Sequence, residues 1–434
     1  MDFLAAVAFF TLSLVFSISK NISTIWPLLL GMVSFSLVAF HRGHDLKSIV
    51  NMLLGGMKKA LALMPIFALI GIITALWRAG GTISFFVYYG TRLMNPQYFI
   101  LFAFFLTCLV SFALGTSFGT AGTIGVVLIV LAKGGGVNPM AAAGAIVSGA
   151  FFGDRCSPVS SSANLVATVT GTNLYTNVKN MFKTGFLPFL LTAAYYAYLS
   201  GRYPLSRANS ELLDQIASYF NLNLLTVLPA AVILFLALMR KNVKLSMFFS
   251  IIAAFFACIY LQKISPVDIL KTMVFGFHIE DGSSLANIIS GGGLLSMVNV
   301  SLVVLIASSY SGIFEGTGML NDIQGFLVRM SDKIGVYLTT MFASIATCAF
   351  CCNQTLPVLL TQQLMDKIYK GKGFSNEELA IDIENTAILI AELFPWSIAI
   401  AVPLATLSVD SGAIPYAVYL YIVPLINVFR LKNA

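Results

Sequence analysis

An acidic residue inside an otherwise apolar stretch is the first candidate for chemistry in this chain. Asp154 and Arg155 lie within Ser148–Thr172, which reads SGAFFGDRCSPVSSSANLVATVTGT, and Pro158 follows them. Proline lacks a backbone donor and clashes with the preceding helical turn, and a charge at the centre of a bilayer costs about 2.5–3.5 kcal/mol on insertion scales. Both are tolerated together at membrane depth only where the backbone lines a protein-walled cavity. We therefore expect a discontinuous membrane helix that carries a binding site.

A second interrupted stretch, IAELFPWSIAI, lies near the C-terminus and holds Glu392 and Pro395. Pro395 is as far from Pro158 along the chain as Lys370 is from Lys133, and each of these lysines opens a glycine-rich loop. Weak internal similarity with paired broken segments is typical of secondary transporters, whose repeats are often inverted in topology. The pattern predicts two broken helices that meet near the bilayer midplane, although chance similarity between apolar segments is the alternative.

The composition is that of a polytopic membrane protein. The 434 residues are 58% hydrophobic and 10% charged, with a mean hydropathy of +0.89, whereas soluble domains carry about 25% charged residues. The apolar runs have the length of membrane helices rather than of barrel strands. The net charge of +7 reflects basic loops at span ends, so it does not indicate nucleic acid. By the positive-inside rule, the basic loop that holds Arg42, Lys47, Lys58 and Lys59 is expected to lie in the cytoplasm. The expected location is the inner (plasma) membrane, which the chain crosses several times.

The predicted fold class is an all-α polytopic membrane protein with two inverted structural repeats, re-entrant hairpins and discontinuous helices. The predicted organisation is N-terminal spans at 1–40, repeat 1 at 41–200 (hairpin near 115–132, broken helix near 153–162), a linker with connecting spans at 201–277, and repeat 2 at 278–434 (hairpin near 353–365, broken helix near 391–397).

The residues of the interrupted stretches indicate a cation site. Half-helix C-termini and freed carbonyls favour cations, and a carboxylate among Ser, Thr and Asn oxygens suits Na⁺. A carboxylate that holds either Na⁺ or H⁺ exchanges one for the other directly. Asp154 is the first candidate, and a structural pair with Arg155 is its alternative role. Glu392 is the second candidate, as a proton or ion carrier, whereas Glu384 and Asp410 lie nearer the span ends, where a solvated role is expected.

The central motif resembles a known family signature. GDRCSPVSSSANLVATVTGT is similar to the GD-x-x-SP-x-S signature of the NhaC-type Na⁺/H⁺ antiporters, a branch of the ion-transporter superfamily. ELFPWSIAI resembles the proline–tryptophan stretch of that family, and GTSFGT resembles its first hairpin. The resemblance implies inverted repeats, alternating access, and Na⁺/H⁺ exchange or Na⁺-coupled movement of a small organic solute. By motif position it adds Ser157 and Ser160 to Asp154 as ion-binding candidates, with Thr116 and Ser117 facing them.

A second reading of the same stretches is a Na⁺- or H⁺-coupled carrier of an amino acid or small organic acid. The serine run Ser160–Ser162 and the neutral second hairpin could cradle a carboxylate. The candidates for contact with such a substrate are Ser117, Ser161, Asn164, Asn353, Gln354, Thr355 and Trp396.

No motif indicates an enzyme, a nucleotide-driven pump or a cofactor, so Na⁺ and H⁺ are expected only as transported or coupling ions. The expected partners are the lipid bilayer and a small ion or small-molecule substrate, with a homodimer as the expected assembly and no nucleic acid.

Overall fold

A computed structural model describes residues 2–19, 25–61, 64–93, 96–205, 210–239, 241, 243–279, 286, 289–317, 324–351 and 353–430 of the chain. The α-helices in chain order are α1 (Asp2–Ser19), α2 (Ile25–His41), α3 (Leu46–Leu61), α4 (Met64–Ala79), α5 (Thr82–Leu93), α6 (Phe99–Leu114), α7 (Ser117–Thr120), α8 (Val126–Gly134), α9 (Pro139–Cys156), α10 (Ser161–Thr170), α11 (Leu174–Arg202), α12 (Ser210–Tyr219), α13 (Leu228–Leu238), α14 (Val243–Tyr260), α15 (Pro266–Phe275), α17 (Val298–Thr317), α18 (Gln324–Ile334), α19 (Val336–Phe350), α20 (Thr355–Gly371), α21 (Asn376–Asn385), α22 (Ala387–Ile390), α23 (Ile398–Thr406) and α24 (Tyr419–Arg430). Short 3₁₀ segments at Pro96–Tyr98, Leu224–Val227, Leu294–Met297, Ala391–Leu393 and Ser411–Tyr416, and a π-helical turn at Ala121–Gly125, join several of them. Within the described ranges no β-strand forms, which confirms the all-α prediction.

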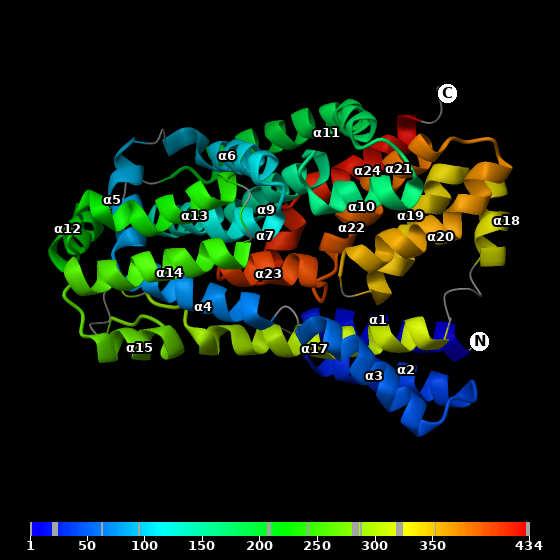
Figure 1. The fold of residues 1–434 in the computed structure, drawn as a ribbon. Helices are drawn as coiled ribbons and strands as arrows, with labels where there is room; N and C mark the ends of the chain where they lie inside the picture. The colour runs from blue at the N-terminus through cyan, green and yellow to red at the C-terminus, as the bar shows by residue number, and fades with distance from the viewer. Residues whose placement is uncertain are drawn as a thin grey trace.

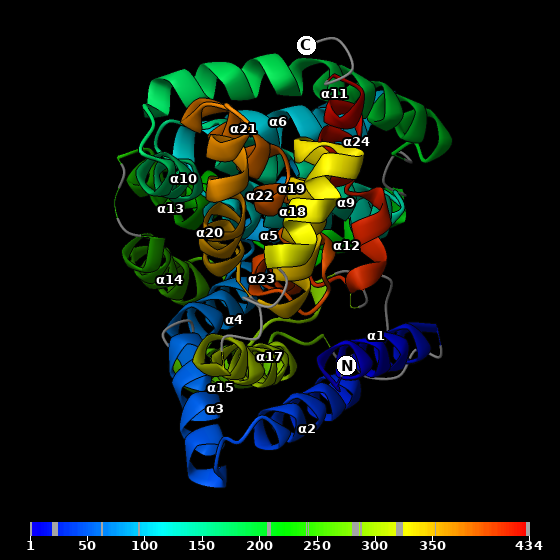
Figure 2. The same cartoon turned by 90° about the vertical axis from the view of Figure 1, so that its right-hand side faces the viewer.

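The helices form two layers of unequal size. Both views show α1, α2, α3, α15 and α17 together along one side of the molecule, below the larger group that contains α9, α10 and α19 to α24 (Figure 1, Figure 2). In the smaller layer α17 packs against α3 and α2, although these helices lie far apart in sequence. The main hydrophobic core belongs chiefly to the larger group, so the interrupted helices lie inside the protein rather than at its edge.

Several helices have the length and composition of membrane spans. Among the described residues, Ser117–Gly134 and Leu294–Phe314 each qualify alone. Three bent pairs qualify only when both members are joined: Met64–Ala79 with Thr82–Tyr89, Leu213–Tyr219 with Leu224–Ile233, and Asn376–Leu393 with Ile398–Thr406. The last pair bends by 56° at its break. The chain is therefore a polytopic membrane protein in which bent helices are common.

The two predicted broken helices are broken where the sequence places the interruption. α9 begins after Asn138, whose side chain accepts from the Met140 and Ala141 amides, and it ends at Cys156. Four residues separate it from α10, which begins at Ser161 with Ser160 as its N-cap. In the C-terminal part, α21 starts with a capping box at Ser375, and the chain leaves helical geometry at Phe394–Ser397 before α23. Both breaks therefore expose helix ends inside the protein.

The two predicted hairpins differ from the structure in their extent. The first hairpin was predicted near 115–132, and in the structure Ser117–Gly134 forms one helical stretch through a π-helical turn at Ala121–Gly125. Close burial of its small residues outweighs the poor helix propensity of glycine and threonine. In the second half α20 continues to Gly371, beyond the predicted limit near 365, because its last turns bury Met365, Ile368 and Tyr369 on one face. Lys367 and Lys370 lie on the exposed face. The division into two inverted repeats stays a prediction.

Close packing of α9 against α6 holds the first broken helix in place. A Cβ atom on Gly153 would lie 2.2 Å from the Ser111 carbonyl carbon and 2.3 Å from the Phe112 amide nitrogen. The hydroxyl of Ser111 in turn donates to the Ala150 carbonyl. Only glycine permits this approach, which fixes the last turn of α9 and so the residue that follows Gly153.

Candidate functional site

Asp154 lies in the last turn of α9, buried at the break. Its side chain is 4% exposed. Its Oδ1 accepts a hydrogen bond from the Ser160 hydroxyl at 3.2 Å, and its Oδ2 accepts one from the Ser162 hydroxyl, also at 3.2 Å. Both serines belong to the start of α10, so the chain turns back on itself around the carboxylate. Hydroxyl oxygens that surround a carboxylate form a ligand set that suits a small hard cation.

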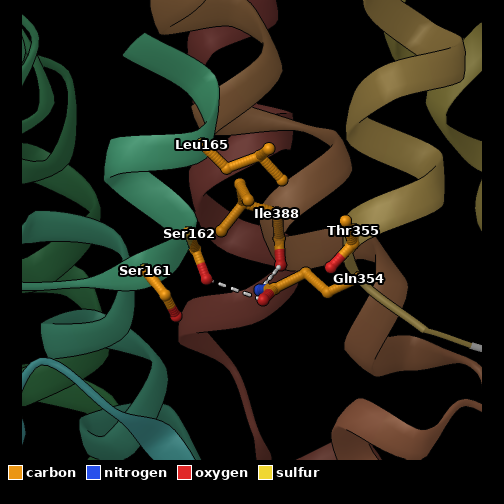
Figure 3. A pocket seen from close by; sticks show the side chains of 6 residues that line it. All are labelled: Ser161, Ser162, Leu165, Gln354, Thr355 and Ile388. Carbon is orange, nitrogen blue, oxygen red and sulfur yellow. Dashed lines mark hydrogen bonds between the residues drawn. The ribbon is translucent and has the colours of Figure 1, made fainter. Parts of the chain in front are cut away.

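Gln354 connects this carboxylate to the second broken helix. The Ser162 hydroxyl donates to Gln354 Oε1 at 2.8 Å. The amide nitrogen of Gln354 donates to Glu392 Oε1 and to the Ile388 carbonyl, both at 3.1 Å. Figure 3 shows Gln354 between Ser162 and Ile388, with α10 on one side and α20 to α22 on the other. Because a hydroxyl carries one proton, Ser162 donates either to Asp154 or to Gln354 at a given moment. The short distances nevertheless place Asp154, Ser162, Gln354 and Glu392 in one row of polar groups, which links two buried carboxylates from opposite halves of the sequence.

A small pocket opens beside this chain of hydrogen bonds. Its volume is about 240 Å³, below the range of about 300–1,000 Å³ typical of drug-sized ligands. The side chains that line it are Ser161, Ser162, Leu165, Gln354, Thr355 and Ile388 (Figure 3). A partly hydrated ion or a very small solute fits such a space.

The other predicted site residues divide into those near Asp154 and those that stabilise local structure. Ser117 lies near Asp154, and Ser161 and Thr355 line the pocket. Ser157 instead donates to the Phe112 carbonyl at 2.6 Å, and Thr116 caps α7 by accepting from the Gly119 amide.

Three further predicted residues make local or distant contacts. Asn164 donates to the Ser160 carbonyl one turn before it, and Asn353 accepts from the Leu356 amide. Trp396 donates to the Ala349 carbonyl at 3.0 Å and packs edge-on against Phe10. In this structure Asn164, Asn353 and Trp396 are not among the residues that line the pocket.

Arg155 and Glu384 are the residues whose place in the site the sequence reading missed. Arg155 is fully buried and makes no hydrogen bond to Asp154; its Nε donates to the Glu384 carbonyl at 3.2 Å. Glu384 was expected to be solvated near a span end, and that expectation is wrong, since its side chain is 0% exposed. The folding of α21 against α10 and α11 buries it. Asp410 does lie at an exposed position, where it caps the Gly412 amide.

The bridging amide carries a testable consequence. Gln354→Leu keeps the approximate volume but removes the acceptor for Ser162 and the donor to Glu392. Because an unsatisfied buried polar group costs about 1–3 kcal/mol, we expect the affinity of this oxygen-lined site for Na⁺ to fall about 10-fold. Titration of the purified protein with Na⁺ measures this. The matched control is Gln363→Leu, at an exposed position of α20, the helix that Gln354 precedes. An equal change in Na⁺ affinity in the two variants would contradict the bridging role of Gln354.

These features define a class of protein before any comparison is made. A helical membrane protein with paired broken helices and buried carboxylates at their breaks is a secondary transporter. The profile of the Na⁺/H⁺ antiporter family matches residues 1–163 and 149–430 of the chain. The chain therefore belongs to the Na⁺/H⁺ antiporter family, which confirms the predicted resemblance; this is a family of transporters, not of enzymes.

Characterised and uncharacterised relatives share nearly the whole length of the chain. An uncharacterized Na⁺/H⁺ antiporter of Haemophilus influenzae is 28% identical over 404 residues, which cover 90% of this chain and 86% of the relative. The Na⁺/H⁺ antiporter NhaC of Alkalihalophilus pseudofirmus is 27% identical over 89% of this chain and 84% of its own. The malate-2H⁺/Na⁺-lactate antiporter of Bacillus subtilis is 26% identical over 91% of this chain and 84% of its own.

Proposed function

We propose that this protein exchanges Na⁺ for H⁺ across the inner membrane, with Asp154 as the carboxylate that binds the two cations in turn. The hydrogen-bonded chain from Asp154 to Glu392 is the observation that carries the proposal. Ser162 contacts both Asp154 and Gln354, and the Gln354 amide donates to Glu392. A change in cation occupancy at Asp154 therefore changes which group Ser162 donates to, and so changes the hydrogen bonding around Glu392.

The residues around Asp154 supply what each cation needs. For Na⁺, the carboxylate and the hydroxyl oxygens of Ser160 and Ser162 are oxygen ligands, with Ser117 beside them. For H⁺, the same hydroxyl groups can rotate to accept from the protonated acid. Because both cations require the same carboxylate, occupancy by one excludes the other. The net result is exchange, provided that the site opens to one side at a time.

The broken helices offer a physical basis for alternating access. The breaks are tight turns, closed by a hydrogen bond from the Ser160 amide to the Ser157 carbonyl and by one from the Ser397 amide to the Phe394 carbonyl. At these turns the flanking helix segments can tilt without loss of intrahelical hydrogen bonds. Movement of one broken helix relative to the other would open the pocket beside Gln354 to alternate sides, as in other transporters with discontinuous helices.

The direct test uses purified protein in proteoliposomes with an internal pH dye. An outward-directed Na⁺ gradient is expected to acidify the lumen, K⁺ at equal concentration is expected to have no effect, and a protonophore is expected to collapse the signal. Absence of Na⁺-dependent proton movement would contradict the proposal.

A second candidate function is exchange of a small carboxylate or amino acid coupled to these ions. The hydroxyl groups of Ser161 and Thr355 in the pocket favour it, as does the malate-2H⁺/Na⁺-lactate antiporter among the relatives. Counterflow of labelled malate, lactate and amino acids in the same proteoliposomes separates the two functions. Exchange that requires such a solute would replace the Na⁺/H⁺ reading.

A further inference from the structure

One buried acid, Glu384, has no role in the proposed exchange of Na⁺ and H⁺ at Asp154. Glu384 lies near the C-terminal end of α21 and is 0% exposed. Both of its carboxylate oxygens are buried and make no hydrogen bond within the described structure. Because an ionised carboxylate without a donor or a counter-ion is costly in a low-dielectric interior, such a group needs a chemical explanation.

The neighbouring guanidinium is occupied by neutral partners. Arg155 donates to the Asn385 side chain, to the Thr184 hydroxyl at 2.9 Å and to the Tyr419 hydroxyl at 3.1 Å. It also donates to the Glu384 and Met181 carbonyls and to the Cys156 sulfur. No ion pair within 4.0 Å involves Arg155 in the part of the chain that the structure describes. The cation is therefore satisfied by dipoles, while the carboxyl beside it makes no polar contact.

This arrangement fits a carboxyl group that carries a proton. Na⁺, as a hard cation, takes several oxygen ligands, and none approaches Glu384 within hydrogen-bonding distance. A proton needs only the carboxyl itself. The charged and titratable groups that interact with Glu384 are Arg155, Asp154 and Cys156, all from α9, and Tyr419 of α24 reaches it through Arg155.

We propose that Glu384 is a second exchangeable proton site, which releases its proton when Na⁺ binds at Asp154 and then pairs with Arg155. The proposal rests on the proposed Na⁺/H⁺ exchange and adds a proton to it. Replacement of the proton on Asp154 by Na⁺ leaves the net charge of that site unchanged, and loss of the second proton leaves a carboxylate whose charge Arg155 neutralises. The O–H bond of Glu384 breaks and its proton passes to water. Arg155 then donates to the carboxylate that remains, in place of one of its present neutral acceptors.

The consequence is a steeper pH dependence of Na⁺ binding. By thermodynamic linkage, log Kd for Na⁺ falls as pH rises, and the magnitude of the slope equals the number of protons released on binding. With both Asp154 and Glu384 as proton sites, Na⁺ binds more tightly as pH rises, with a slope of about two, and Glu384→Gln lowers the slope to about one. The readout is Na⁺ binding to the full-length purified protein at a series of pH values, together with proton release into weakly buffered solution.

The control variants keep this test specific. Asp382→Asn alters a carboxylate on the same helix that accepts from the Tyr369 hydroxyl at 2.6 Å, and it should keep the wild-type slope. Glu384→Asp keeps the acid on a shorter side chain, so it should shift the pH midpoint of Na⁺ binding. This variant replaces Glu384→Gln in the test if the glutamine variant is not recovered as folded protein.

The outcomes separate this inference from the proposed function. If Asp154→Asn still binds Na⁺ with proton release, the proposed exchange site fails. The role of Glu384 alone is overturned if Asp154→Asn loses both Na⁺ binding and proton release while Glu384→Gln keeps the wild-type slope. It is also overturned if Glu384→Asp keeps the wild-type pH midpoint of Na⁺ binding. An equal loss of slope in Asp382→Asn would also overturn it.

Discussion

Asp154→Asn is expected to abolish Na⁺-driven proton movement in proteoliposomes, with a loss of about 100-fold or more. The substitution keeps the size and a hydrogen-bonding side chain, so the contacts with Ser160 and Ser162 can persist. It removes the charge that binds either cation. Removing one partner of a buried charge pair costs about 3–5 kcal/mol, and each 1.4 kcal/mol is tenfold in binding.

The matched control for this result is Asp268→Asn. Asp268 is 59% exposed and pairs with Lys271 on the surface of α15, so its loss should leave transport within a factor of two of the wild type, because exposed pairs contribute about 0–1 kcal/mol. Wild-type rates in Asp154→Asn, with the protein correctly inserted, would remove Asp154 from the mechanism.

The second large effect is on folding. Arg155→Met is expected to destabilise the protein by more than about 4 kcal/mol, because several buried acceptors lose a donor and each unsatisfied group costs about 1–3 kcal/mol. The lost bonds join α9 to α11 at Thr184, to α21 at Asn385 and to α24 at Tyr419. The thermal unfolding midpoint of the detergent-solubilised protein measures the change.

Arg202→Met is the comparison for that measurement. Arg202 ends α11 on an exposed surface, with its guanidinium 6.0 Å from the centre of the Tyr203 ring. Its substitution should shift the unfolding midpoint little. If Arg155→Met unfolded at the temperature of Arg202→Met, the arginine would not fasten the four helices together.

The break between α9 and α10 shows how far local sequence rules reach. A buried charge, a proline and a run of serines predicted an interruption near 153–162, and α9 indeed ends at Cys156. The same rules exaggerated the interruption after Gly115, because a glycine- and threonine-rich segment buried on most sides can stay helical. Local propensity is a weak prior that packing overrides.

The sequence by itself determined that the chain is an all-α membrane protein with two interrupted helices and a carboxylate at each. Hydropathy and the cost of charge in lipid allow few other interpretations of Asp154 and Glu392. Only the tertiary structure decided that Gln354 joins these two acids and that Arg155 turns toward α21 rather than toward Asp154. It also decided that Glu384 is buried. The physical reason is that the partners of a buried polar group come from helices far apart in the chain, so they depend on how those helices pack.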